Sequence, residues 1–192
     1  MIQQYFWNLI PRIESKFKDL FVITDEIGRE ILTDLGQTLS YPVSQNLFTL
    51  KRKYSSKTEF SDELAELQQS DAMKRFPCIY INSDLVKVTY DNLNEIATFG
   101  EIDIINLSDP IWKTEDRDSQ SFEPILNNLY DLFIQGCNLS KDFSLVSKGT
   151  RHDCYFWGVA GQNGGIKAQL TDHVDVINIT NLQVRIYKHC EQ

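Results

Sequence analysis

A short run that is apolar at almost every position sets the tightest limit on how this chain can fold. The run has the sequence FPCIYI and spans Phe76 to Ile81. A strand with one face in water alternates apolar and polar residues, whereas a continuous apolar run of this length is typical of a strand buried on both faces. We therefore predict a central strand over 76–81.

Other segments of the second half of the chain also have the composition of strands. They are the runs 85–89, 95–107, 143–146, 154–158 and 174–187. The residues 90–94 between the first two include Asp91 and Asn92, which suit a hairpin turn. Within 95–107, side chains from Ile102 onward alternate between the two faces of the strand. We expect one face to lie in the core and the other to be only partly buried. The glycine-rich 158–165 is predicted to be a mobile connection.

The clearest helix signal lies among these strands. Apolar residues at helical spacing form a single stripe, made up of Phe122, Ile125, Leu126, Leu129, Tyr130 and Phe133. Such a stripe predicts a helix with one buried face. We expect it to span 121–136, with Pro124 in its first turn and Gly136 as its C-terminal cap.

For the first seventy residues we predict a mixture of helices and extended segments. Residues 5–17 carry an amphipathic stripe, and Pro11 implies either a kink or a helix that begins there. Leu20 to Ile23 is a short β-branched run, after which Thr24 is expected to cap a helix ending near Gly36. The segment 37–57 predicts an extended loop that leads into an edge strand at 47–50, and a further helix is expected over 61–75.

Together these elements predict a single α+β domain over residues 1–192, with helices packed on a mostly antiparallel sheet. The strand-rich core is expected at 76–187. No linker or internal repeat divides the 192 residues, and a chain of this length buries roughly 70% of its unfolded surface.

The charge and cysteine content exclude several classes of protein. A net charge of −8 argues against a nucleic-acid binder, because that affinity comes mainly from lysine and arginine. The one basic run, Lys51 to Lys53, is interpreted as a solvated strand or loop end, with a phosphate contact as the alternative. The four cysteines show no CxxC pair and are expected to be free thiols in a reducing cytoplasm. No apolar run approaches the ~18 residues needed to span a bilayer, and no signal peptide is expected at the N-terminus.

No catalytic, cofactor-binding or metal-binding residue is predicted. His152 and Cys154, with His173, His189 and Cys190, could in principle bind zinc, but their spacing fits no common zinc motif. Neither Cys78 nor Cys137 can be placed beside a histidine from sequence. The loop Gly158 to Gly165 lacks the Gly-Lys-Ser/Thr ending of a phosphate-binding loop.

The order of segments in 70–187 resembles a family of phage structural proteins. The residues that carry the resemblance are Phe76 to Ile81, Ile102 to Leu107, Trp112 to Arg117, Phe122 to Tyr130 and Asp175 to Ile186. In this order they resemble head–tail junction proteins of Bacteroidetes phages, including the crAss-like group, and the broader tail-completion and tail-terminator fold. The resemblance rests on packing patterns and carries no catalytic signature.

The resemblance implies a virion protein that is assembled in the bacterial cytoplasm. It implies a homo-oligomeric ring, six- or twelve-fold, between the portal or an adjacent neck ring and the tail proteins, with DNA passing through the bore without specific binding. Loops with exposed aromatic residues often provide subunit contacts. Our interface candidates are Trp112, Arg117 and Trp157, and our candidates for the channel wall are Asp109, Glu115, Asp116 and Asp118.

Two other classes of protein remain open from the sequence. A cytosolic adaptor that binds one peptide would remain a monomer and expose one apolar groove. A small hydrolase or transferase would need a pocket in which perturbed ionisable groups converge.

Overall fold

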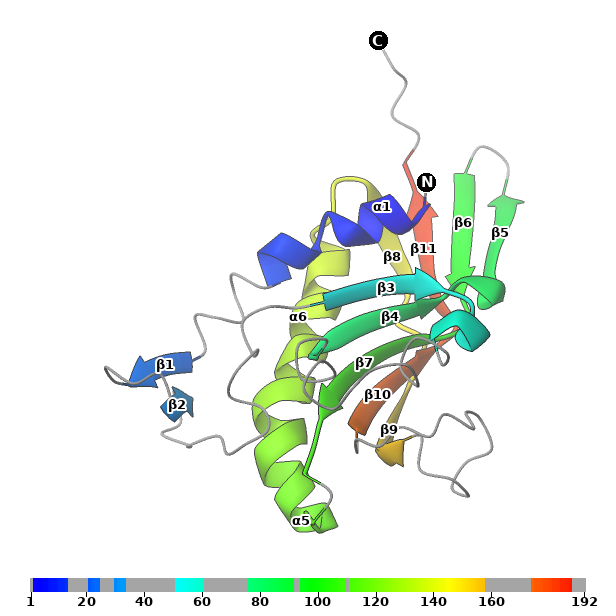
Figure 1. Ribbon diagram of the computed structural model, residues 1–192. Coiled ribbons are helices and arrows are strands. Elements are labelled where there is room, and N and C mark those ends of the chain that lie inside the picture. The colour runs from blue at the N-terminus through cyan, green and yellow to red at the C-terminus, as the bar shows by residue number, and fades with distance from the viewer. Residues whose placement is uncertain are drawn as a thin grey trace.

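Two β-sheets joined by four chain segments form the centre of the protein (Figure 1). The computed structural model describes residues 2–13, 21–24, 30–33, 51–60, 76–91, 94–109, 111–157 and 174–187. A five-stranded sheet has the order β3-β4-β7-β10-β9, and a four-stranded sheet has the order β5-β6-β11-β8. Among the described strands, only β3 and β4 pair in parallel, so the predicted α+β domain with a mostly antiparallel sheet is confirmed.

The strands of the larger sheet are β3 (Lys51–Ser55), β4 (Cys78–Asn82), β7 (Ile102–Leu107), β10 (Val174–Thr180) and β9 (Thr150–Trp157). Those of the smaller sheet are β5 (Val86–Asp91), β6 (Asn94–Phe99), β11 (Leu182–Ile186) and β8 (Phe143–Ser147). A separate hairpin pairs β1 (Phe21–Thr24) with β2 (Glu30–Thr33). The helices are α1 (Ile2–Trp7), the 3-10 helix η3 (Ser83–Leu85), α5 (Thr114–Arg117), the π-helix η4 (Asp118–Leu126) and α6 (Asn127–Asn138).

Four chain segments pass from one sheet into the other. β4 continues through η3 into β5, β6 into β7, β8 into β9, and β10 into β11. The four segments have the same order in both sheets. They form β4-β7-β10-β9 in the five-stranded sheet and β5-β6-β11-β8 in the four-stranded sheet. The two sheets therefore form one four-segment antiparallel surface that bends across its middle, with β3 added at one edge.

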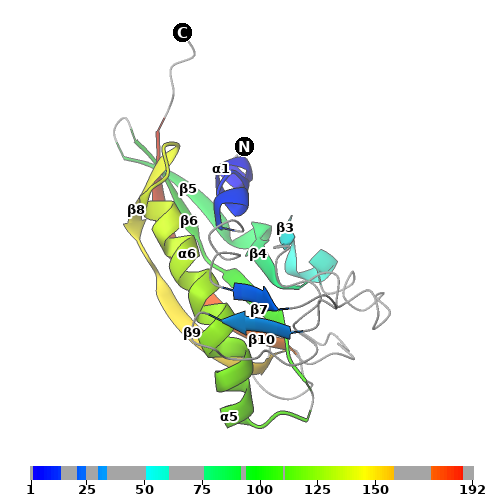
Figure 2. The same ribbon diagram turned by 90° about the vertical axis from the view of Figure 1, so that its left-hand side faces the viewer.

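The main core lies between this bent surface and the helices α1, η4 and α6 (Figure 2). Phe6 of α1 stacks with Phe133 of α6 and Phe143 of β8, with ring centroids 5.9 and 4.9 Å apart, and meets Phe99 of β6 edge-on at 4.6 Å. Aromatic pairs of this kind add to the free energy gained from burial. The stripe predicted for the long helix is confirmed, because five of its six residues are buried and Tyr130 packs against the same core.

The other face of the five-stranded sheet is also buried. Ile79 and Ile81 of β4 face the helices, whereas Cys78 and Tyr80 belong to a second cluster with Phe60 and Val176. Every residue of β4 and of β7 is buried. The prediction of a central strand over 76–81 is thus confirmed, and the second face of 102–107 is more fully buried than the alternation suggested.

Two segments that we predicted as single strands are each two strands. The run 95–107 is divided at Gly100, whose N–H donates to the carbonyl of Leu85 at 2.9 Å. A Cβ at Gly100 would lie 2.9 Å from that of Leu85, so glycine permits the close approach at the bend. The run 174–187 is divided at Asn181, whose φ of 58° is a left-handed conformation that asparagine tolerates well. Both divisions are points where the chain changes sheet.

The long helix begins earlier and ends later than predicted. It starts at Thr114, where the carboxylate of Asp116 accepts a hydrogen bond from the backbone N–H of Lys113 at 3.0 Å. Pro124 therefore lies inside η4 and not in a first turn, and the amide of Asn128 donates to its carbonyl at 2.8 Å. Gly136 is not the cap, because the helix continues to Asn138.

The prediction of a helix that begins at Thr24 is wrong for residues 30–33, which are the residues of that segment that the structure describes. Residues 30–33 form β2, antiparallel to β1. Their β-branched residues, Ile31 and Thr33, favour strands, and this preference outweighed the capping signal. In the first stripe, α1 ends at Trp7 and a second helical piece spans 10–13, so the break falls next to Pro11 as expected.

Other predictions for the first half of the chain, and for 158–173, are partly outside the described residues. Of the loop 37–57, residues 37–50 and the expected edge strand 47–50 are not described, while 51–55 form β3 and not a loop. The expected helix over 61–75 and the glycine-rich connection 158–165 also lie outside the described residues.

Two glycines give a paired prediction about stability. At Gly149, φ is +70° and an added Cβ would lie 2.2 Å from the carbonyl oxygen of Thr180. At Gly136, an added Cβ would contact side chains of Leu9 and Ile13 at an ordinary 3.8 Å. We expect Gly149→Ala to lower the free energy of unfolding by about 2 kcal/mol or more, and Gly136→Ala to raise it by about 0.5–1 kcal/mol. Urea unfolding measures both, and equal effects of the two substitutions would contradict the conformation given to Gly149.

Candidate functional site

The predicted interface residue Arg117 lies entirely inside the subunit. Its side chain is 0% exposed and forms an ion pair with Asp175 of β10, with Nη1 and Oδ1 2.6 Å apart. Nη1 also donates to Oγ of Ser108 at 2.5 Å, and the guanidinium donates to the carbonyls of Asp109 and Trp112 at 3.0 and 3.3 Å. Arg117 thus joins the start of the long helix to β10 and to the segment after β7. This burial corrects our expectation that Arg117 contacts a neighbouring subunit.

The two candidate tryptophans are placed differently. Trp112 is partly buried and packs against the main core. Trp157 ends β9, where its backbone pairs with Val174. The side chain of Trp157 lies outside the described residues. Beside Trp112, Ile111 is 83% exposed, and this accessible apolar side chain was not among our candidates.

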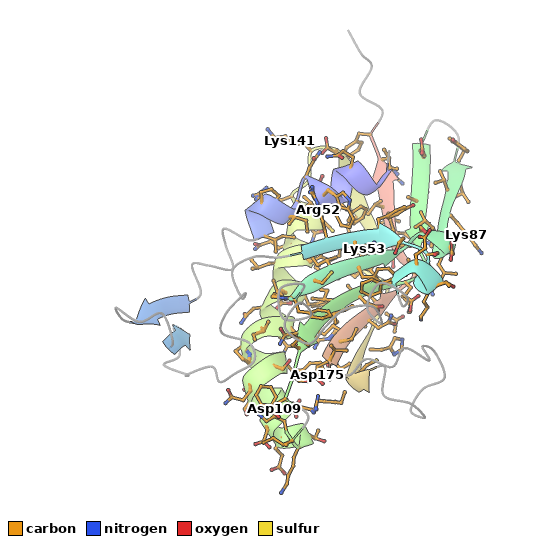
Figure 3. All side chains as sticks on the ribbon, viewed as in Figure 1. Arg52, Lys53, Lys87, Asp109, Lys141 and Asp175 are labelled. Atoms are coloured by element: carbon orange, nitrogen blue, oxygen red, sulfur yellow. The ribbon has the colours of Figure 1, made fainter. Side chains whose placement is uncertain are left out.

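The four candidate channel acids lie together at the N-terminal end of the long helix, the end marked by Asp109 in Figure 3. Glu115 and Asp116 are exposed, while Asp109 and Asp118 are partly buried. Oδ1 of Asp109 accepts from the N–H of Ile111 at 3.0 Å, and Oδ1 of Asp118 accepts from the hydroxyl of Tyr155 at 2.6 Å. Acidic side chains at a helix N-terminus are stabilised by its unpaired N–H groups and dipole.

Tyr155 is therefore coupled to this acidic end. Burial, the hydrogen bond to Asp118 and nearby carboxylates raise the pKa of Tyr155 to about 12. Its ring also packs against Phe122, with centroids 4.7 Å apart. The contact fixes the position of Asp118 relative to β9. Glu115 and Asp116 are exposed to solvent, although Asp116 also accepts the hydrogen bond from Lys113.

A buried polar cluster on the second face of the five-stranded sheet was not predicted. Asp103 of β7 is 0% exposed, and its Oδ1 accepts from Nδ2 of Asn178 at 2.5 Å. Within the described part of the chain, Oδ2 of Asp103 has no hydrogen-bond partner. Glu101 lies nearby, where it accepts from Lys57 at 2.8 Å and from Asn82 at 2.6 Å.

The surroundings of Asp103 favour its neutral form. Burial and the charge of Glu101 raise the pKa of Asp103 to about 7, although the Asn178 hydrogen bond and Lys57 oppose the shift. On the adjacent strand, burial and the same carboxylates raise the pKa of Tyr80, whose hydroxyl donates to the carbonyl of Ser55 at 3.2 Å. A charged residue within the apolar run 102–107 was the available sequence signal for this cluster.

The residues weighed for metal or thiol chemistry do not come together in the described ranges. His152 is exposed on β9, and burial raises the pKa of the neighbouring Cys154 thiol. Among residues with described positions, no three His, Cys, Asp or Glu side chains are grouped to hold a metal ion. Cys78 and Cys137 are buried, and burial raises the pKa of the Cys137 thiol. His173, His189 and Cys190 lie outside the described residues.

A shallow hollow between the N-terminal segment and α6 has a volume of about 10 Å³. Its lining includes Arg12, Leu132 and Leu139. Pockets for small organic ligands are typically ~300 Å³ or larger, so this hollow has room for about one water molecule.

The basic run lies on an edge strand. Lys51 to Lys53 belong to β3, which is the first strand of the five-stranded sheet. Arg52 packs over the ring of Trp7 with 5.8 Å between its Cζ and the ring centroid, so it connects β3 to α1. The expected position of this run at the end of a strand is therefore confirmed, and Arg52 has a packing role as well.

Across the described ranges, no helix combines the length and the apolar character needed to cross a bilayer. Comparisons of the chain with protein-family models, curated proteins and solved structures found no match.

Proposed function

We propose that this protein is a non-catalytic subunit of a homo-oligomeric ring, six- or twelve-fold, in the head–tail connector of a tailed phage. In this proposal the ring joins the portal side to the tail and surrounds the DNA channel. The phage setting comes from the sequence resemblance over 70–187. The ring itself is supported by one observation, which is that the four-stranded sheet has two different open edges.

These edges are β5 and β8, on opposite sides of the four-stranded sheet. Each edge strand carries an exposed apolar side chain, Val88 on β5 and Val146 on β8. A closed ring requires each subunit to offer two different, complementary surfaces, whereas a two-fold dimer requires one self-complementary surface. Two distinct edges on opposite sides of one sheet suit the ring.

The charge distribution supports a role around DNA that does not grip it. With a net charge of −8, and with exposed acids at Glu115 and Asp116, the subunit repels a phosphate backbone at short range. Repulsion keeps a sliding duplex centred, whereas a lysine-rich wall would retard it. That Asp109, Glu115, Asp116 and Asp118 face the bore remains our proposal, and their position at a helix N-terminus also has the local cause given above.

Mass in solution tests the proposal. Six or twelve copies of the 22.3 kDa chain weigh about 134 or about 268 kDa, and we expect one of these species to accumulate as the concentration of purified protein rises. Native mass spectrometry and sedimentation velocity measure the mass. A chain that stays monomeric and binds one extended peptide would instead favour the adaptor.

A further inference from the structure

The two outer strands of the four-stranded sheet are open for further pairing. Each pairs with a single neighbour among the described residues, β5 with β6 and β8 with β11. Residues 87–90 of β5 are exposed on both faces of the sheet, as are Val146 and Ser147 at the end of β8. An edge strand offers a row of backbone N–H and C=O groups that another strand can complete.

The edge of β5 carries little of the common protection against such pairing apart from the exposed Lys87. The sequences 84–91 and 141–148 contain no proline. β5 pairs with β6 over six residues without a bulge, whereas the register between β8 and β11 shifts at Val146. Val88 and Val146 are 37% and 46% exposed, so the open edges are also apolar. Proteins that do not use their edge strands usually shield them with prolines, bulges or inward-pointing charges.

The direction of the strands determines which edges can meet. All neighbours in the order β5-β6-β11-β8 are antiparallel, so β5 and β8 run in opposite directions. When two copies are related by rotation about an axis nearly parallel to the strands, β8 of one copy lies beside β5 of the next in the antiparallel sense. The same rotation repeats around a ring, and a contact between β5 and β8 can therefore close it.

The charges at the ends of the two strands are complementary in this arrangement. Asp84 is exposed just before β5, and Lys148 is exposed just after β8. Antiparallel pairing brings the start of β5 to the end of β8, and thus Asp84 towards Lys148 of the neighbouring copy. Opposite charges across paired strands stabilise the pairing.

We infer that β8 of one copy adds to β5 of the next, so that the four-stranded sheets form a continuous belt around the oligomer. The occupant of each open edge is a second copy of this chain. The inference rests on the proposed ring and names the surface that builds it. Figure 1 shows β5 at one margin of the sheet, with β8 beyond β11 on the other side.

A charge-reversal series tests this contact. Lys87 of β5 and Val146 of β8 are both exposed. Lys87 lies on the sheet face turned away from the core, because Val86 beside it packs against the core. Val146→Glu alone places an acid near Lys87 of the neighbour and is expected to preserve assembly. Lys87→Glu with Val146→Glu places two acids together and is expected to weaken assembly about tenfold. Lys87→Glu with Val146→Lys is expected to restore it.

The control makes the same change in charge at the far end of the molecule. Ile111→Glu with Lys113→Glu also alters the net charge by −3 at two exposed positions, and we expect it to leave assembly unchanged. Sedimentation at a series of concentrations gives the association constants, and circular dichroism checks that each variant is folded. Hydrogen exchange of the wild-type protein provides a second measurement, with amides of 86–91 and 143–147 protected only in the oligomer.

The outcomes separate this inference from the proposed ring. A wild-type oligomer that all charge variants form equally well, without added protection of β5 and β8, overturns the contact and leaves the ring intact. A wild-type chain that is monomeric at every concentration overturns both. Loss of assembly in the double-acid variant, with recovery in the reversed pair, supports both.

Discussion

Replacing Arg117 by methionine is expected to lower the free energy of unfolding by about 3–5 kcal/mol. The substitution keeps most of the side-chain volume but leaves the carboxylate of Asp175, which is 0% exposed, without its cation. It also removes the donors to Ser108 and to the carbonyls of Asp109 and Trp112. Urea unfolding, followed by tryptophan fluorescence, measures the change.

Arg151 provides a matched control for this prediction. It pairs with Asp153 at the same 2.6 Å, but the two side chains are 29% and 39% exposed. Exposed pairs contribute little, so Arg151→Met is expected to cost about 1 kcal/mol or less. Combining Arg117→Met with Asp175→Leu removes both buried charges and is expected to recover much of the loss. Similar costs for Arg117→Met and Arg151→Met would show that the buried pair is not an anchor.

The second large effect concerns the pH dependence of stability, through Asp103. Its pKa is about 7 in the folded protein, against an ordinary value of 3.8. A carboxyl with a raised pKa holds its proton more tightly when folded, so it favours the folded state fully below pH 3.8. That advantage is lost as the pH rises through 7. Three pKa units correspond to at most about 4 kcal/mol.

Asp103→Asn removes this titration while keeping the shape of the side chain. We expect the variant to match the wild type within about 1 kcal/mol at pH 5 and to be about 2 kcal/mol more stable at pH 8, where the wild type must bury a charge. Chemical unfolding of both proteins between pH 5 and pH 8 measures the difference. A constant difference across this range would mean that Asp103 does not titrate there.

Sequence patterns predicted the strands and helices in which every side chain on a given face is buried in the core. The run 76–81 is apolar because both faces of β4 are buried, and the stripe from Phe122 to Phe133 follows one buried helix face. Both patterns are local, and they remain visible without knowledge of the partners. The break next to Pro11 was likewise predictable, because proline constrains its own backbone.

The points where strands change sheet were not predictable in the same way. Gly100 is needed because Leu85, fifteen residues earlier, crosses it at the bend. Asn181 carries the left-handed turn between two runs that look continuous in sequence. In each case the cause is a contact between distant segments. Continuous β-branched composition therefore suggested one strand where there are two.

The candidate site residues also divide into those that local sequence places correctly and those whose position depends on distant segments. Asp109, Glu115, Asp116 and Asp118 do gather at one end of the molecule, because they are close in sequence. Arg117 was misassigned, since its partner Asp175 lies 58 residues away and only the fold brings the two together. Asp103 was overlooked for a similar reason, as its burial depends on strands from three parts of the chain.

Electron microscopy of the purified oligomer shows whether the subunits form a ring. We predict closed rings with six- or twelve-fold rotational symmetry and a central opening, in which β5 of each subunit lies beside β8 of the next. A monomer at all concentrations, or a two-fold dimer whose subunits meet through the same surface, would contradict it.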